Sequence, residues 1–450
     1  MEATPRFGIR QVAAFLFSIL LLATFSAQAQ DWVRTGTNLG AQKIRLAAAD
    51  FKMAGNDPAL SNAQQSFNQV LYSDLTNAGI FDMVSKSLAP PVMPGSPQEI
   101  NLSQWSSAPA NAAMVAFGAI NVQNGRTIVY GWLFDTKNTQ SPQVLGQQYN
   151  EAAGPNTARH IAHEFADAII SRLGGGINGI AETTIFYSSD RSGAKEIWQM
   201  DYDGANQHQI THLGQISLSP RISPDGSRLA FNELSSKGST IRLYSMNLNR
   251  MVNFPIHDGT DFSPAWAPDG NNLAFSSSRS GDPEIWTTSA SGFNLRRVTA
   301  YRGPDVSPVW NPKTGTQLAW ISGRTGLPQV YIMDSDGTGV QRMTDGGYAT
   351  SPSWSPNGQF LAFAWSRHYG PGAPGGQDIY VMDIASHRWI QLTHDLGRTD
   401  FPSWSPDGRH IVFEVAHHGR SEVWTMLADG SEQHALTKVG NSRMPNWSWK

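Results

Sequence analysis

The chain has 450 residues, a formal net charge of -3 and no cysteine. The near-neutral charge argues against a nucleic-acid-binding surface, because such proteins carry a marked basic excess. The lack of cysteine excludes disulfide bonds, thiolate chemistry and a lipid-modified N-terminal cysteine, so the fold must be stabilised by burial of apolar side chains.

The first 29 residues have the pattern of a secretory signal peptide. Arg6 and Arg10 precede an apolar run over residues 12–25, and residues 27–29 read Ala-Gln-Ala, a small-x-small cleavage pattern. The apolar run is too short to cross a bilayer. We therefore expect a secreted mature chain that begins near Gln30 and has no transmembrane segment.

Residues 30–175 predict a small α/β domain. Residues 43–47 look like a strand, and Ser61 is expected to cap a helix that has one apolar face. Two extended runs, residues 114–122 and 127–134, flank an Asn-Gly pair, which is a strong signal for a β-hairpin.

A second helix is expected to begin at Asn156 or Thr157 and to end at a run of three glycines. Its His160 and His163 lie three apart, but the pattern is not His-Glu-x-x-His and no third ligand is evident. We interpret both as partly exposed helix residues rather than metal ligands. The proline-rich residues 90–109 are expected to form a long surface loop.

From about residue 219 to the end, a Pro-x-Trp phrase recurs, most often followed by a turn that resembles Ser-Pro-Asp-Gly. Its aromatic position repeats at intervals of 44, 44, 44, 50 and 43 residues, and one copy carries isoleucine instead. Repeats of roughly 40–50 residues with strand-like content indicate the blades of a β-propeller. The six positions are Ile222, Trp266, Trp310, Trp354, Trp404 and Trp447.

Each repeat holds four short strands, A to D, with Pro-x-Trp on A and a Pro-Asp-Gly turn between A and B. Six repeats predict an all-β propeller of six blades over residues 176–450. The first blade lacks an A strand, whereas the chain ends on an orphan A strand at residues 444–449. We therefore expect the C-terminal strand to complete the first blade and close the ring, which leaves no open sheet edge there.

Binding is expected at one end of the propeller. In an antiparallel blade the A–B and C–D turns share one end, the turn face, and the B–C and D–A loops share the other, the loop face. The loop face carries variable polar residues and an insertion at residues 368–377, and variable loops on a rigid framework commonly bind partners. For each aspartate, the alternative is that it only caps a turn. The candidate binding residues are His257, Asp258, Asp261, Arg302, Asp305, Tyr348, Arg398, Asp400 and Arg443.

Catalytic signatures are weak. The sequence has no Gly-x-Ser-x-Gly elbow. The Asp-x-Asp-Gly turns at Asp201 and Asp334 lack the closing glutamate of a calcium loop, and Arg191, Arg279 and Arg324 fit B–C hairpin turns. We expect a binding protein, without metal or cofactor, rather than an enzyme. The alternative is a secreted propeller enzyme, of the lyase or glycosidase type, with His, Tyr, Glu and Arg converging at the channel mouth.

The chain resembles the TolB family, the periplasmic component of the Tol–Pal system, over essentially the whole mature chain. The resemblance rests on the domain order, the six repeats with a closing strand, and the helix sequence of residues 158–169 followed by Gly179-Ile180. It implies a periplasmic protein that binds a Pal-like peptidoglycan-associated lipoprotein on the loop face, with His257 as the foremost contact. It also implies roles in outer-membrane integrity and cell division. We expect a monomer that binds no nucleic acid.

The resemblance further implies that the mature N-terminus binds a TolA-like protein of the inner membrane. The expected contacts are Asp31, Trp32, Val33 and Arg34. A terminal stretch of this composition is mobile unless it is docked, and its tryptophan is expected to be exposed and to anchor the segment on the partner.

Overall fold

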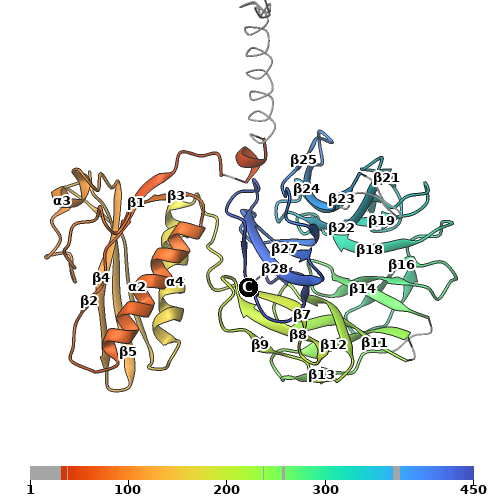
Figure 1. Ribbon diagram of the computed structural model, residues 1–450, viewed down its shortest axis with the longest axis horizontal. Coiled ribbons are helices and arrows are strands. Elements are labelled where there is room, and N and C mark those ends of the chain that lie inside the picture. Colours follow the sequence, from red (N-terminus) through yellow and green to blue (C-terminus); the bar gives the residue numbers. More distant parts are fainter. Residues whose placement is uncertain (1–31, 38, 237, 256–258, 368–375, 450) are drawn as a thin grey trace, which may run out of the picture.

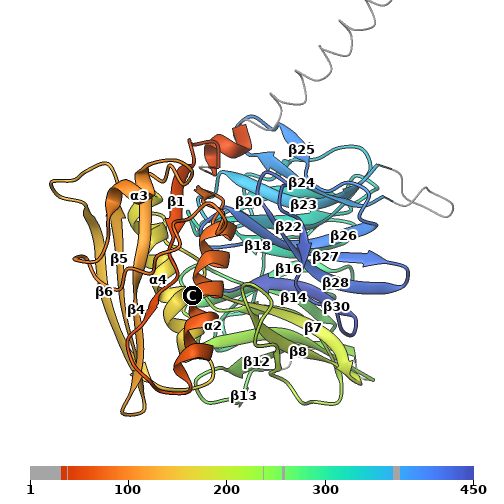
Figure 2. The same cartoon turned by 60° about the vertical axis from the view of Figure 1, so that its left-hand side comes forward.

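The computed structural model describes residues 32–37, 39–236, 238–255, 259–367 and 376–449. It places a small α/β domain, called the front domain below, beside a six-bladed β-propeller (Figure 1). In both views the helices α2 (Leu60–Asn77) and α4 (Thr157–Leu173) lie between the front-domain sheet and the propeller (Figure 2). The fold class expected from the sequence is confirmed.

The front domain is built on one mixed sheet in the order β3-β1-β4-β5-β6, with β2 paired to β4. Strand β1 is parallel to β3 and β4, whereas β4, β5 and β6 are antiparallel. The β4–β5 hairpin turns at Asn124 and Gly125, whose φ angles of 53° and 70° are the positive values that its two-residue turn requires. The strands are β1 (Ile44–Ala48), β2 (Lys52–Met53), β3 (Phe81–Met83), β4 (Met114–Gln123), β5 (Arg126–Asp135) and β6 (Gln143–Ala152).

The apolar faces of α2 and α4 pack on one side of this sheet and form the main core of the front domain. Apolar residues recur at helical spacing on each helix, so each buries one continuous stripe. This burial stabilises the domain and fixes both helices against the sheet, which leaves their outer sides for the propeller. The buried stripe consists of Phe67, Leu71, Leu75, Ile161, Phe165 and Ile169.

Two expectations for the front domain are wrong. Helix α2 begins at Leu60 behind Ala59 and has no side-chain cap, so Ser61 lies inside the helix and does not cap it. The stretch expected to be a surface loop contains helix α3 (Leu102–Ser106), whose Trp105 is fully buried against the second side of the sheet. A large aromatic side chain of this kind adds enough buried area to order a stretch that is otherwise rich in proline.

Each propeller blade is a four-stranded antiparallel sheet. Blade two is β10 (Ile216–Ile222), β11 (Arg228–Ser235), β12 (Gly238–Ser245) and β13 (Arg250–Val252), and blade three is β14 (Asp261–Trp266), β15 (Asn272–Ser277), β16 (Glu284–Ser289) and β17 (Arg296–Arg297). Blade four is β18 (Asp305–Trp310), β19 (Gln317–Ser322), β20 (Gln329–Asp334) and β21 (Gln341–Arg342). Blade five is β22 (Tyr348–Trp354), β23 (Phe360–Ser366), β24 (Asp378–Asp383) and β25 (Trp389–Gln391), and blade six is β26 (Arg398–Trp404), β27 (His410–His417), β28 (Arg420–Leu427) and β29 (His434–Ala435).

Blade one is assembled from both ends of the propeller sequence, as expected. Its order is β30-β7-β8-β9, so the C-terminal strand β30 (Ser442–Trp447) pairs with β7 (Thr184–Ser192). Strands β8 (Ala194–Asp201) and β9 (His208–Gln209) complete it. Closure of the ring by the chain end therefore fixes the central channel.

All six inner strands share one irregularity that the repeat did not predict. The residue before the proline of each Pro-x-Trp phrase has a positive φ angle, between 50° and 56°, and the register with strand B shifts there. The bulge re-aims the strand, so that the residue after the proline lines the channel. The bulged residues are Ser219, Ser263, Ser307, Ser351, Phe401 and Met444.

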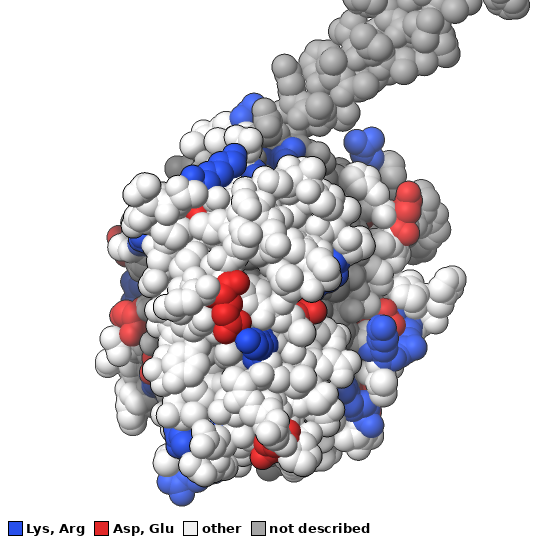
Figure 3. All heavy atoms as spheres, turned by 90° about the vertical axis from the view of Figure 1, so that its left-hand side faces the viewer, with Lys and Arg blue, Asp and Glu red and all other residues white. Residues whose placement is uncertain are grey.

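The described part of the chain contains no helix long and apolar enough to cross a membrane. The face of the front domain that points away from the propeller is largely uncharged, with basic and acidic side chains scattered over it (Figure 3). This face therefore shows no basic patch of the kind that binds nucleic acid.

Candidate functional site

The aspartates expected at the mouth of the loop face are anchors. Asp305 is fully buried, and Arg324 of the following B–C turn donates to its carboxylate at 2.9 Å. Asp261 is buried in the same way, and Arg279 donates to both of its oxygens at 2.8 and 2.9 Å. These ion pairs tie each B–C turn to the start of an inner strand. The alternative that these aspartates hold loops in place fits their burial.

The same arginines stack on aromatic rings. The guanidinium of Arg279 lies 4.9 Å from the centre of Trp286, and that of Arg324 lies 4.9 Å from Tyr331. In blade one, Arg191 lies 4.4 Å from Trp198. The assignment of these arginines to B–C turns is confirmed. These contacts hold the B–C turns of three blades against their strands.

The exposed members of the candidate set are cationic or aromatic. Arg302 and Arg398 are exposed, and Tyr348 and Arg443 are partly buried. These four side chains therefore reach the surface of the loop face. His257 and Asp258, together with residues 368–375 of the expected insertion, lie outside the described residues.

Two carboxylates and two arginines meet inside the loop-face end of the channel. Asp400 accepts hydrogen bonds from Arg398 at 3.2 Å and from Thr350 at 3.1 Å. Arg443 lies 3.7 Å from the carboxylate of Glu414. Burial raises the pKa of Glu414, and the nearby charge of Asp400 raises it further. This end of the channel is therefore polar and holds charge of both signs.

The two histidines of α4 have different environments. His163 is buried and its Nδ1 lies 2.7 Å from Asp74, so the expectation that it is partly exposed is wrong. His160 is exposed, with Nδ1 at 3.1 Å from Glu151. Glu151, His160 and Glu164 offer oxygen and nitrogen atoms within 4.8 Å of one another. Because His160 already has a carboxylate partner and no further feature points to a ligand, we assign no metal to this group.

A buried polar cluster joins the front domain to the propeller. Asp74 of α2 accepts a hydrogen bond from the Tyr202 hydroxyl at 2.6 Å, while His163 of α4 holds its other oxygen. Burial raises the pKa of Asp74, and the hydrogen bonds from His163 and Tyr202 oppose that rise. On the propeller side, Nε2 of His410 lies 2.7 Å from the carbonyl of Asn77. The apolar pattern of the sequence did not predict this cluster.

The Asp-x-Asp-Gly turn of blade one is a docking site for α4. Arg159 donates to Asp203 at 2.6 Å and to Asp201 at 3.2 Å. The turn assignment of Asp201 is confirmed, because it closes the β8–β9 connection. The acidic turn therefore holds an arginine of the front domain.

The N-terminal segment differs from its expectation. Residues 32–36 are helical, Val33 is fully buried, and Trp32 lies 5.5 Å from the ring of Phe360 on the turn side of blade five. A Cβ atom on Gly36 would come within 2.2 Å of the same ring, so only glycine fits there. Arg34 adds an ion pair of 3.6 Å to Asp429. Burial of apolar side chains therefore holds this stretch against the propeller. Asp31 lies outside the described residues.

The link between the domains contains an aspartate with a shifted pKa. Asp167 of α4 accepts the backbone N–H groups of Ala181 and Glu182 at 3.0 and 3.3 Å. Burial raises its pKa to about 7, although these two hydrogen bonds lower it. A Cβ atom on Gly179 would lie 1.9 Å from the carboxylate, so the link passes directly over it.

The raised pKa of Asp167 predicts a pH-dependent stability. The folded state holds this proton more tightly than the unfolded state, so the contribution to stability is full below the ordinary pKa of 3.8 and is lost as pH rises through about 7. The stability of the wild type relative to Asp167→Asn should therefore fall by about 2–4 kcal/mol between pH 4 and 8. Urea unfolding of both proteins across this range measures it. A constant difference would show that the carboxyl titrates as it does in water.

Comparisons with known proteins agree with this architecture. A family model described as the TolB amino-terminal domain matches residues 37–141, and one described as the TolB beta propeller domain matches residues 172–370 and 345–450. The crystal structure of TolB from Acinetobacter baumannii covers 91% of this chain and 97% of its own, with a TM-score of 0.76 and 24% identity, which shows a shared fold.

Curated relatives match over a shorter stretch. The Tol-Pal system protein TolB of Actinobacillus succinogenes is 29% identical over 232 residues, which is 51% of this chain and 52% of the relative. That of Mannheimia succiniciproducens is 30% identical over 243 residues, covering 52% of this chain and 53% of the relative. The chain therefore spans about half the length of the curated relatives that it matches.

Proposed function

Because this chain belongs to the TolB family, we propose that it is a periplasmic protein-binding scaffold of a Tol–Pal-type envelope complex. In this role it links a Pal-like peptidoglycan-associated lipoprotein of the outer membrane to a TolA-like protein of the inner membrane. Such a link supports outer-membrane integrity and cell division. The observation that carries the proposal is the loop face, where arginine–aspartate pairs fix the loops and leave Arg302, Tyr348, Arg398 and Arg443 at the surface.

The alternative, a secreted propeller enzyme, requires His, Tyr, Glu and Arg to converge at the channel mouth. One described charged group there consists of Asp400, Glu414, Arg398 and Arg443. Each carboxylate has an arginine beside it, so both resemble structural ion pairs more than a paired acid and base. We therefore propose binding rather than catalysis.

The loop face is tested by capture of a purified Pal-like lipoprotein. Arg302→Ala and Arg398→Ala should each weaken binding by about 1–2 kcal/mol if they are central contacts, because most interface residues contribute little. Arg302 is exposed, so the Tm of Arg302→Ala should stay near the wild-type value, whereas Arg398→Ala also removes the ion-pair partner of the buried Asp400 and should lower Tm slightly. Calorimetric titration measures the affinity. Asp305→Ala is unsuitable, since it would leave Arg324 buried without its partner.

Lys313→Ala is the matched control, because Lys313 is an exposed cation in an A–B turn on the opposite face. Its affinity for the lipoprotein should equal that of the wild type. Loss of binding in Lys313→Ala, with none in Arg302→Ala or Arg398→Ala, would move the interface to the turn face.

The N-terminal contact has its own test. Trp32, Val33 and Arg34 contact the propeller, so we propose that a TolA-like domain binds the segment after it is released. Gly36→Ala places a methyl group against Phe360 and should favour release. Overpacking of this kind costs on the order of 1–3 kcal/mol, so affinity for a TolA-like domain should rise roughly tenfold. Deletion of residues 30–33 should abolish binding, and retained binding would refute the contact.

Release of the segment also predicts coupling between the two partners. If occupancy of the loop face biases release, a Pal-like ligand and a TolA-like ligand must change each other's affinity by the same factor. Titration of each ligand in the absence and presence of the other measures that factor. Independent affinities would refute the coupling and leave both contacts intact.

A further inference from the structure

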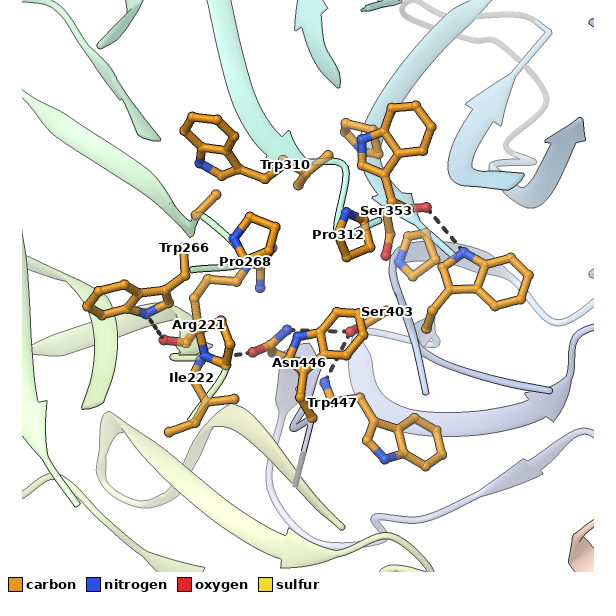
Figure 4. A pocket seen from close by; sticks show the side chains of 18 residues that line it. Arg221, Ile222, Trp266, Pro268, Trp310, Pro312, Ser353, Ser403, Asn446 and Trp447 are labelled. Atoms are coloured by element: carbon orange, nitrogen blue, oxygen red, sulfur yellow. Dashed lines mark hydrogen bonds between the residues drawn. The ribbon is translucent and has the colours of Figure 1, made fainter. Parts of the chain in front are cut away.

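The turn-face end of the central channel holds a cavity of about 360 Å³ (Figure 4). Pockets for small molecules begin at roughly 300 Å³. The bulges of the inner strands aim one residue of each Pro-x-Trp phrase at this space, and prolines and tryptophans of the same phrases fill the wall between them. The six aimed residues are Arg221, Ala265, Val309, Ser353, Ser403 and Asn446.

One residue of this ring is charged. Arg221 is the sole charged side chain among the described residues that line the cavity. Its Nη1 donates to the carbonyl of Pro220 at 2.9 Å, and the guanidinium makes no ion pair within the described part of the chain. In Figure 4 the side chain extends from the wall into the space that the ring encloses. This strand departs from the repeat at two positions: Arg221 is charged, and Ile222 replaces the tryptophan.

Arg221 is partly buried, and a partly buried guanidinium is more stable with an anion beside it than without one. Burial with no carboxylate to offset it lowers the pKa of Arg221 to about 10. Arg279 and Arg324, at the other end of the propeller, show the usual arrangement, with a buried aspartate for each. The partner of Arg221 is therefore missing from the described chain, and the cavity in front of it has room for one.

We propose that this cavity binds an organic monocarboxylate, with Arg221 holding the carboxylate and the tryptophan and proline wall holding an apolar body. A single cation matches a single negative charge, and a guanidinium binds a carboxylate through two parallel hydrogen bonds. Ser353, on the blade opposite Arg221, offers a hydroxyl to the ligand. The site lies at the far end of the channel from the loop face, so it goes beyond the partner binding proposed above.

The test uses the full mature chain and calorimetric titration with benzoate. Benzoate should bind saturably, and its neutral counterpart benzamide at least tenfold more weakly, because a charge-assisted hydrogen bond contributes roughly 1.5–3 kcal/mol. Arg221→Leu should lose at least tenfold in benzoate affinity, and Arg221→Lys should bind at an intermediate strength. Since Arg221 has no anionic partner, the leucine variant should keep or raise Tm, whereas loss of a structural arginine would lower it.

Arg228→Leu is the matched control. Arg228 lies 4.8 Å from the ring of Trp266 and donates to the carbonyl of Gly270, but it does not line the cavity. Its substitution should leave benzoate binding unchanged. Equal binding of benzoate and benzamide, or full affinity in both Arg221 variants, would overturn the proposal. If chloride or inorganic phosphate binds as strongly as benzoate, the cavity is a site for any small anion. That result would overturn the proposal that the wall recognises an apolar ligand body.

Small organic acids and peptide C-termini both carry a single carboxylate, so a second set of titrations separates these two kinds of ligand. An alanine-alanine-phenylalanine peptide is titrated as the free acid and as the C-terminal amide. Tighter binding of the peptide acid than of benzoate, with loss in the amide, supports the proposal and assigns the carboxylate to a chain end. Tighter binding of benzoate supports it and assigns the carboxylate to a small molecule.

Discussion

Removal of residues 441–450 is expected to unfold the propeller at physiological temperature or to lower its Tm by more than any point substitution considered above. The deletion takes β30 from blade one and leaves β7 as an open edge in the middle of the ring. It also removes Trp447, which is 2% exposed and donates to the Thr183 hydroxyl at 2.7 Å. Loss of a buried tryptophan alone costs about 3–5 kcal/mol.

Two point variants separate closure from a general effect at the chain end. Trp447→Ala should lower the free energy of unfolding by about 3–5 kcal/mol. Trp449→Ala should lower it by much less, because Trp449 is 39% exposed and lies beyond the strand. Thermal unfolding of the three proteins by circular dichroism gives the comparison. A deletion variant that unfolds at the wild-type temperature would refute the role of β30.

The propeller could be predicted from the sequence because its signal is repeated six times. The same phrase marks each inner strand, and the missing strand at one end equals the surplus strand at the other. In the front domain, the asparagine-glycine turn and the glycine stop of α4 also gave correct elements. Each of these signals is contained in a short stretch of sequence, so it can be read without knowing which other segments pack against that stretch.

Features that depend on distant partners could not be predicted. Strand β6 is an edge strand with glutamines on its exposed positions, so it lacks a strand-like apolar alternation. Residues 32–36 have the composition of a mobile terminus, yet they pack near Phe360, more than 300 residues away, so that Val33 is fully buried and Trp32 partly buried. In each case tertiary contact overrides a weak local preference.

The loop-face aspartates, expected to contact a partner, instead hold the loops in place. Asp261 and Asp305 head inner strands, and their arginines follow at separations of 18 and 19 residues. Both members of each pair hold fixed places in the repeat, so the pairing had a sequence signal. That signal separates anchors from the exposed Arg302 and Arg398, whose places vary from blade to blade.

The contact between the two domains depends on Asp74, which is 2% exposed. Asp74→Ala is expected to lower the free energy of unfolding by about 3–5 kcal/mol, because it leaves the buried His163 and the buried Tyr202 hydroxyl without their acceptor. Tyr202→Phe removes one hydrogen bond and should cost about 1–2 kcal/mol. Asp82→Ala is the matched control: its ion pair with Arg45 is exposed and should contribute no more than about 1 kcal/mol.

A double variant tests whether Asp74, His163 and Tyr202 act as one unit. Once Tyr202→Phe has removed the hydroxyl, Asp74→Ala no longer leaves that hydroxyl without an acceptor. The loss of unfolding free energy in Asp74→Ala/Tyr202→Phe should therefore be smaller than the sum of the two single losses by about 1 kcal/mol or more. The front domain and the propeller each keep their own apolar core, so losing the cluster should also split unfolding into two calorimetric transitions. Strictly additive costs and one transition would mean that the domains are held together elsewhere, with the Arg159 ion pairs to the acidic turn as the next contact to remove.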